Sequence, residues 1–166
     1  PSGAQPRYLP IPVSFQGTAM LPIVRRDRSI ERSLEEGRGV DVAVFTVGSL
    51  GREALSLNLG QLEDDEVEAL LRDAVGDACS RFFTREGDVA LASVDRRTVG
   101  ITLDELRSRP VRVLVAGGRD KAEALDTALH MGLATHLVVD QDLALALLER
   151  PRGATPRGVR DSTPSG

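Results

Sequence analysis

The segment 111–125, VRVLVAGGRDKAEAL, constrains the fold of this chain more than any other part of the sequence. An apolar run typical of a β-strand ends at Gly117-Gly118, and an alanine-rich helical pattern that carries Lys121 follows directly. Two glycines allow the backbone to approach an anion, the amides of a helix start point toward it, and an ammonium group adds charge. The segment predicts either a turn that holds a small phosphorylated ligand or an ordinary strand-to-helix turn, and it lacks the third glycine of a dinucleotide site.

Strand and helix patterns alternate along most of the chain, which indicates an α/β fold. The run Val40–Val47 is continuous and β-branched, as in a parallel strand buried on both faces, and Gly48-Ser49 closes it. The segment 76–94 predicts two antiparallel strands around the turn Arg85-Glu86-Gly87-Asp88. We also expect a weak strand or a strap over 8–15, strands over 97–101, 111–116 and 136–139, a loop over 51–61, and helices over 29–36, 63–74, 102–109, 119–131 and 141–149. The sequence therefore predicts a doubly wound, mostly parallel Rossmann-like sheet with an inserted β-hairpin.

Composition limits the classes of function. The 166 residues, 41% of them apolar, suffice for one domain with a core. A net charge of −4 argues against direct binding to DNA or to an anionic membrane surface, and neither a signal peptide nor a spanning apolar run is recognisable. The single cysteine, Cys79, is predicted to be a small core residue. The isolated His130 and His136 do not suggest a metal site. We expect a cytoplasmic protein that uses no cofactor and no metal.

The two ends differ in composition from the middle of the chain. The chain starts at Pro1 without an initiator methionine, and residues 150–166 are rich in Gly, Pro, Ser and Arg. Such a composition cannot bury apolar surface, so we expect disorder over 1–7 and 150–166 and a folded part over 8–149. We also expect the chain to be a fragment of a longer protein.

Several segments together resemble one family. The segments are YLPIP at 8–12, DVAVFTVGS at 41–49, AVGDACSRFFTREGD at 74–88 and RTVGITLDELRSRPVRVLVAGGRDKAEAL at 97–125. Their order and spacing are similar to those of the sugar-binding domain of SorC/DeoR/CggR-type bacterial transcriptional regulators. Thr46 departs from the pattern, because a glycine is usual there.

The resemblance implies the C-terminal part of an effector domain, in the fold group of glucosamine-phosphate deaminase, ribose-phosphate isomerase and CoA transferase. It further implies a homo-oligomer whose effector is a sugar or sugar phosphate. Binding to DNA would occur only through a helix-turn-helix domain that this chain does not contain. The Gly-Thr loop that helps to hold the phosphate in the family would also lie outside the chain.

Six residues are candidate ligand contacts, and each has a second interpretation. Lys121 either pairs with a phosphate or hydroxyl beside Gly117 and Gly118 or lies solvated on the surface. Asp77 either accepts hydrogen bonds from sugar hydroxyls or caps a turn. Gly48 and Ser49 either contact the ligand or simply close a tight turn. Arg52, Arg81 and Arg97 are interpreted as solvated arginines, and Asp120 as a residue that supports a helix start.

Three functions remain open at this point, the third being a chain that binds no ligand and serves only as an oligomerisation surface. The first is an effector-binding module that performs no chemistry and shifts the operator affinity of a full-length regulator. The second is a sugar-phosphate isomerase or deaminase of the same fold group, which needs an acid–base pair next to a carbonyl. The sequence offers few residues for that chemistry, so no catalytic residue is predicted.

Overall fold

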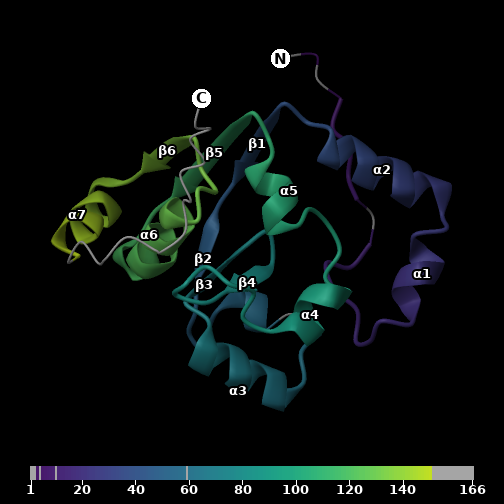
Figure 1. The fold of residues 1–166 in the computed structure, drawn as a ribbon, viewed down its shortest axis with the longest axis horizontal. Coiled ribbons are helices and arrows are strands. Elements are labelled where there is room, and N and C mark those ends of the chain that lie inside the picture. The colour runs from purple at the N-terminus through teal and green to yellow at the C-terminus, as the bar shows by residue number, and fades with distance from the viewer. Residues whose placement is uncertain (1–2, 4, 10, 59, 151–166) are drawn as a thin grey trace, which may run out of the picture.

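The computed structural model describes residues 3, 5–9, 11–58 and 60–150. Within this part the elements follow one another as α1 (Met20–Val24), α2 (Arg28–Arg38), β1 (Val42–Phe45), β2 (Val47–Ser49), η1 (Leu55–Leu57), α3 (Asp64–Asp73), β3 (Gly76–Ala78), β4 (Arg81–Phe83), α4 (Ala92–Arg97), α5 (Leu103–Arg107), β5 (Val111–Ala116), η2 (Arg119–Lys121), α6 (Ala122–His130), β6 (His136–Val139) and α7 (Gln141–Glu149), as Figure 1 shows. The predicted disorder over 151–166, and at residues 1, 2 and 4, lies outside the described residues.

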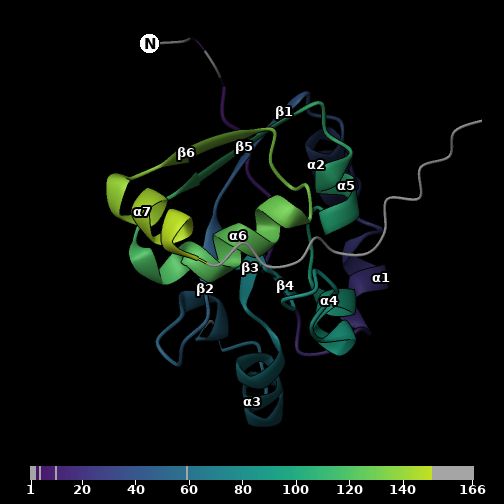
Figure 2. The same cartoon turned by 60° about the vertical axis from the view of Figure 1, so that its left-hand side comes forward.

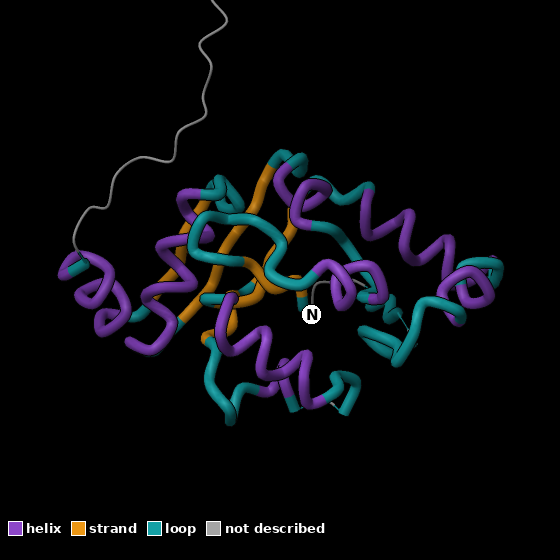
Figure 3. Tube along the Cα trace, turned by 60° about the horizontal axis from the view of Figure 1, so that its bottom comes forward, coloured by secondary structure: helices purple, strands orange, loops and turns teal. Residues whose placement is uncertain are grey.

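The strands form two sheets. One has the order β1-β5-β6 and is parallel throughout, and the other has the order β2-β3-β4 and is antiparallel. The strands lie together in the middle of the molecule with helices beside them (Figure 3). The predicted α/β fold, with a mostly parallel sheet and an inserted hairpin, is confirmed.

The predicted strand Val40–Val47 is divided between the two sheets. Val42–Phe45 pairs with β5, whereas Val47–Ser49 pairs with β3 after a break at Thr46. Val42 and Val44 are 52% and 69% exposed, so burial of this strand on both faces is wrong for the part of the chain that the structure describes. Only the face that carries Phe45 is covered.

The hairpin is present, and the structure has one turn more than the sequence predicts. β3 and β4 are joined by Cys79 and Ser80, which both have positive φ, 53° and 60°. Two such residues in a two-residue hairpin loop are the geometry of a type I′ turn. The predicted turn Arg85–Asp88 is also present, with the Gly87 amide donating to the Thr84 carbonyl at 3.0 Å, and the chain on either side of it pairs antiparallel through a bridge from Phe83 to Val89. The turn at 85–88 is thus confirmed, and the turn at Cys79-Ser80 was not predicted.

Two other strand predictions are wrong. Residues 92–94, the end of the segment expected to form the hairpin, are helical as part of α4, and 97–101 contains only an isolated bridge from Ser14 to Thr98. That same bridge is the only strand-type pairing of the described part of 8–15. The helix α1 was not predicted.

The predicted helices agree well with the structure because their capping signals are local. Thr102 and Glu105 form the capping box of α5, with the Glu105 amide 3.1 Å from the Thr102 Oγ1 and the Thr102 amide 2.8 Å from Glu105 Oε2. Helix α3 likewise has acidic residues in its first turn. Gly132 directly follows the end of the α6 segment with φ of 68°.

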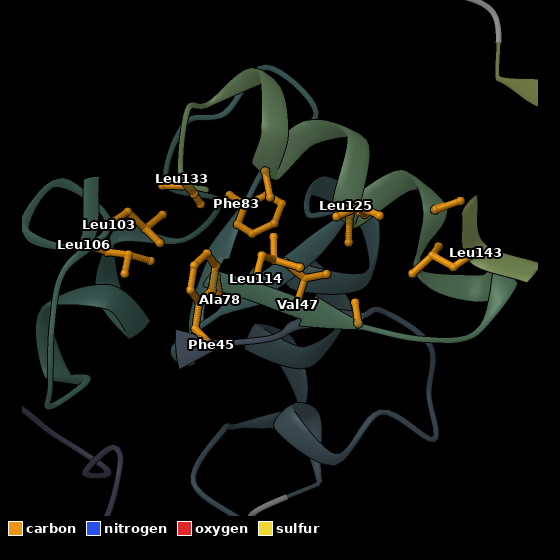
Figure 4. Close-up of a cluster of buried hydrophobic side chains, with 14 of the residues drawn as sticks. Phe45, Val47, Ala78, Phe83, Leu103, Leu106, Leu114, Leu125, Leu133 and Leu143 are labelled. Carbon is orange, nitrogen blue, oxygen red and sulfur yellow. The ribbon is translucent and has the colours of Figure 1, made fainter. Parts of the chain in front are cut away.

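The main core lies between the parallel sheet and the helices α6 and α7. Leu114 of β5, Leu125 of α6 and Leu143 of α7 are fully buried there together with Phe83 (Figure 4). Each buried leucine contributes about 1.5–3 kcal/mol to stability. Cys79 packs against this cluster, as the sequence predicts. Figure 2 shows α6 and α7 on one side of the β1-β5-β6 sheet.

Candidate functional site

The candidate site lies where β2 and β3 meet the start of α6. Gly48 of β2 is the direct partner of Asp77 of β3, and Ser49 is the partner of Gly76. The turn η2, which carries Lys121, contacts β2, and α6 contacts both β2 and β3. Four of the six predicted residues, Gly48, Ser49, Asp77 and Lys121, are thereby brought to one region of the molecule.

Gly48 leaves the space that the Asp77 side chain occupies. A Cβ at position 48 would lie 2.2 Å from Asp77 Oδ1, so a larger residue would displace the carboxyl group. Gly76 allows a similar close approach, because a Cβ there would lie 2.4 Å from the Ala124 Cβ of α6. Gly48 therefore leaves room for the Asp77 carboxyl group, and Gly76, on the other face of β3, allows the strand to approach α6.

Burial raises the pKa of the Asp77 carboxyl above its ordinary value. Interactions with the Ser56 side chain, the Ser80 backbone amide and the Lys121 charge oppose part of this rise. A carboxylate that loses hydration on folding gains from any ligand that donates hydrogen bonds to it. Asp77 is therefore suited to sugar hydroxyls, and Ser56 places the predicted loop 51–61 beside it.

The hydroxyl of Ser49 donates a hydrogen bond of 2.5 Å to Asp120 Oδ2. This contact joins the end of β2 to η2, although 71 positions separate the two residues. Asp120 also lies against the glycine pair, since a Cβ at Gly118 would be 2.7 Å from its Oδ1. Asp120 is thus part of the site rather than only a support for the helix start.

The glycine pair follows β5 directly, as predicted, and meets a carboxylate of its own chain. The Gly118 amide donates to Asp140 Oδ2 at 2.9 Å, and a Cβ at Gly117 would lie 2.6 Å from the same oxygen. Asp140 also caps α7, where it accepts from the Leu143 amide at 2.8 Å. Gly118 has φ of 95°, a conformation that favours glycine. The Asp140 carboxylate of the same chain therefore accepts the hydrogen bond of the Gly118 amide in this structure.

Lys121 lies at the junction of η2 and α6, where it is the N-cap residue of the helix. It is half-buried, and its charge acts on Asp77. Among the described residues, no carboxylate oxygen lies within 4.0 Å of its ammonium group. The neighbouring Arg119 differs, because it pairs with Glu149 at 2.5 Å. Lys121 is therefore available to a ligand in a way that Arg119 is not.

Two of the arginines interpreted as solvated are buried instead. Arg81 is 3% exposed and donates to the carbonyls of Asp95, Thr98, Gly100 and Ile101. Arg97 is 6% exposed and pairs with Glu66 at 2.5 Å. Both arginines hold the hairpin and α3 against the segment around α4, so their role is structural.

Arg52 agrees with its interpretation as a surface residue. Its side chain is 72% exposed and pairs with Glu68 at 2.9 Å. The structure records no contact between Arg52 and the polar residues around Asp77.

We define the polar cluster as Ser49, Asp77, Asp120 and Lys121. Sequence reasoning missed Ser56 and Asp140, which approach it from a distant loop and from the start of α7. The cluster combines carboxylates that accept hydrogen bonds, hydroxyls that donate and accept, and one ammonium group, which is the set that recognises a polyol. Within the described residues, no group of three or more His, Cys, Asp or Glu side chains is arranged to hold a metal ion.

Helices, a parallel sheet and a polar cluster at a strand end define an α/β ligand-binding domain. The model of the "Putative sugar-binding domain" family matches residues 2–149, and the chain belongs to this family. The predicted resemblance to the sugar-binding domains of SorC/DeoR-type regulators is confirmed.

Individual relatives agree with this assignment. The chain is 41% identical over 143 residues to the Deoxyribonucleoside regulator of Bacillus subtilis, and the match covers 86% of this chain and 46% of that protein. It is similar to the DeoR family transcriptional regulator from Listeria monocytogenes, with 33% identity, a TM-score of 0.77, and coverage of 85% of this chain and 57% of that one. The chain thus spans about half the length of the relatives that it matches.

A third relative is a single domain. The crystal structure of a domain of a "possible sugar-binding transcriptional regulator" from Arthrobacter aurescens matches with 29% identity and a TM-score of 0.78. The match covers 88% of this chain but only 56% of that domain.

In the part of the chain that the structure describes, no helix is long and apolar enough to cross a membrane.

Proposed function

We propose that the chain is the effector-binding part of a bacterial transcriptional regulator and binds a sugar or sugar phosphate at the polar cluster. The observation that carries this proposal is that strand pairing and the contact of η2 with β2 bring the segments of Ser49, Asp77 and Lys121 to one region, in a member of a sugar-binding family. Asp77 and Asp120 would accept hydrogen bonds from sugar hydroxyls, and Lys121 would pair with a phosphate or hydroxyl. The ligand contacts also include Gly48, Gly117 and Gly118.

The full-length protein is where binding would have its effect. A ligand that favours one arrangement of domains or subunits shifts the operator affinity by the difference in its affinity for the two arrangements. We infer that residues 8–149 form the sensing part, that the regulator is a cytoplasmic homo-oligomer, and that a separate helix-turn-helix domain contacts DNA. The names of the relatives as transcriptional regulators support this inference.

We further propose that the ligand is bound without being transformed. Proton transfer next to a carbonyl needs a positioned acid–base pair, and a histidine is the usual choice. His130 is instead held on the last turn of α6, with Nδ1 2.8 Å from the Asp126 carbonyl. His136 contacts the Thr135 hydroxyl on β6. Neither side chain contacts the polar cluster.

The test is a thermal-shift titration of the chain with a panel of pentoses, hexoses and their phosphates. The panel includes 2-deoxyribose and its phosphate, because the Bacillus subtilis relative is named for deoxyribonucleosides. A ligand at 100 times its Kd adds about 2.7 kcal/mol, which raises the melting temperature by roughly 5–10 °C. Stabilisation without turnover supports the sensor. Conversion of a sugar phosphate by the purified chain would contradict it.

A further inference from the structure

A small cavity lies between four separated segments of the chain, next to two residues that contact Asp77. Its volume is about 20 Å³. Most of its lining residues are polar but uncharged, and the rest are apolar. The polar ones are Ser14, Ser56, Gln61, Ser80 and Thr98. The cavity is therefore a meeting point of the segment before α1, the loop after β2, the hairpin β3–β4 and the end of α4.

The hydroxyl of Ser14 is the polar group in this lining that the protein leaves unsatisfied. Ser14 is 7% exposed, and its Oγ has no hydrogen-bond partner among the described residues. The backbone holds the residue in place, because Ser14 bridges to Thr98 and the Val99 amide donates to the Val13 carbonyl at 2.6 Å. A buried hydroxyl without a partner destabilises a fold, and native proteins nearly always supply one. The cavity that Ser14 lines is where such a partner can bind.

The size and the chemistry of the cavity define that partner. One water molecule needs a cavity of about 10–15 Å³, whereas pockets for drug-sized ligands start near about 300 Å³. None of the lining residues carries a charge, so an ion would gain no compensation for its lost hydration. Hydroxyl groups both donate and accept hydrogen bonds, and an internal water typically uses two to four such partners. The cavity therefore fits a single neutral molecule of the size of water.

We propose that this cavity is a hydration site in which one water molecule joins Ser14 to Ser56. The water accepts the proton of the Ser14 hydroxyl and donates to the Ser56 hydroxyl. It thereby ties the segment 13–15 to the loop 51–61. The Ser56 side chain also contacts Asp77, so the bound water lies one residue away from the buried carboxyl. This site is separate from the polar cluster and does not depend on which ligand the cluster binds.

The direct test is a crystal structure of the chain at a resolution that shows ordered water. We expect a water oxygen about 2.7–3.2 Å from the Oγ atoms of both Ser14 and Ser56. In the variant Ser14→Val, whose side chain fills the cavity and offers no hydroxyl, this water should be missing while the fold is unchanged. A parent structure whose cavity holds no water, or whose Ser14 hydroxyl bonds to a protein group instead, would overturn the proposal.

Thermal unfolding provides a second measurement, in which the sign of the shift decides. Ser14→Ala should lower the melting temperature by about 3–5 °C, because a hydrogen bond to the water is lost. If no water is bound, the same substitution removes an unsatisfied buried group and raises the melting temperature. The matched control is Ser93→Ala in α4, an exposed serine whose hydroxyl lies 3.5 Å from Glu66 Oε1. The control should shift the melting temperature by no more than about 1 °C.

A double variant tests the bridge itself. Ser56→Ala alone should also lower the melting temperature, because it removes both the water contact and the contact with Asp77. In Ser14→Ala/Ser56→Ala the loss should be smaller than the sum of the two single losses, since either substitution already breaks the bridge. Strictly additive losses would show that no water joins the two hydroxyls and would overturn the proposal.

Discussion

Lys121 and the buried carboxyl of Asp77 should contribute differently to ligand binding and to stability, and substitutions can separate the two contributions. Lys121 acts on Asp77 through its charge, and it lies in the same 3-10 turn as Arg119. Arg119 pairs with Glu149, so its charge is already satisfied. The two neighbouring cations therefore provide a matched comparison within one turn.

Lys121→Ala should weaken binding of a phosphorylated sugar by roughly 10- to 100-fold and leave the unliganded fold intact. The physical reason is the loss of one hydrogen bond to a charged group, worth about 1.5–3 kcal/mol. Isothermal titration calorimetry measures the change, and Arg119→Ala is the control, expected to bind as the parent does. Equal affinity of Lys121→Ala and the parent would remove Lys121 from the site.

Asp77→Asn should stabilise the unliganded domain at neutral pH and abolish its response to ligand. Burial raises the pKa of Asp77 above the value of 3.8 that it has in the unfolded chain, so the folded state binds the proton more tightly. Ionisation thus costs stability as pH rises from 3.8 through the folded pKa, and the cost is absent at lower pH. The advantage of Asn should therefore shrink as pH falls from the folded pKa toward 3.8 and be absent at lower pH.

Urea denaturation at pH 7 and pH 3 measures this difference. Asp73→Asn is the control with the opposite sign, because the hydrogen bond from Arg72 lowers the pKa of Asp73. That variant should not be more stable than the parent at pH 7. If Asp77→Asn is less stable than the parent at neutral pH, Asp77 is a structural residue that caps the turn.

Among the elements, the hairpin β3–β4 shows a conflict between local sequence and backbone geometry. Cys79 and Ser80 adopt positive φ, which is costly for residues with a Cβ. Ser80→Gly should therefore stabilise the domain by about 1 kcal/mol, since glycine adopts positive φ without a Cβ clash and Cys79 keeps its contact with the core. Equilibrium denaturation measures the gain. Ser80→Val should have the opposite effect, and stabilisation by valine would contradict the turn assignment.

Arg81 connects this hairpin to the segment between α4 and α5. Its guanidinium donates to four backbone carbonyls and to the Asp95 carboxylate. Arg81→Met should cost about 3–5 kcal/mol, because it leaves these acceptors and a carboxylate without a partner. Arg81→Lys should recover little, since an ammonium cannot reproduce the fork geometry. A loss below about 1 kcal/mol in thermal unfolding would contradict this role.

The elements also show how far the sequence determines the fold. Capping boxes such as Thr102 with Glu105 are local, so five helical segments were predicted correctly, whereas α1 and α4 were missed. The turn at 85–88 was predicted because its Gly-containing sequence has a strong turn signature, whereas the turn at Cys79 and Ser80 was missed because their positive φ is imposed by strand pairing. Residues 92–97 alternate in polarity but fold as α4, where Val94 is buried against Leu70.

The candidate site was predicted only in part for a related reason. Gly48, Asp77 and Lys121 stand in recognisable motifs, but Asp140 and Ser56 reach the site through tertiary contacts that leave no local pattern. The exposure of Val42 and Val44 was not predictable from the sequence. A continuous apolar run indicates a strand that favours burial, but it does not show whether another element of the chain packs on each face.

For the molecule as a whole, the net charge predicts that this chain alone does not bind DNA. A net charge of −4 argues against a basic DNA-binding face on this chain, because affinity for the phosphates of DNA arises mainly from clustered Lys and Arg. A gel-shift assay with operator DNA should show no complex at micromolar protein, even at low salt. A salt-sensitive complex of the isolated chain would assign the DNA contacts to this domain and contradict the separate helix-turn-helix.

The carboxylates of Asp120 and Asp140 determine what an incoming ligand has to do. Ser49 and the Gly118 amide are already engaged by these two groups, so a ligand that uses them must exchange one set of hydrogen bonds for another. An anion that approaches the glycine turn also meets the negative charge of Asp140. On the proposed function, selectivity would therefore rest on displacement: a ligand that replaces both internal acceptors would break the contact between η2 and the end of β2 and the contact between the glycine turn and the start of α7.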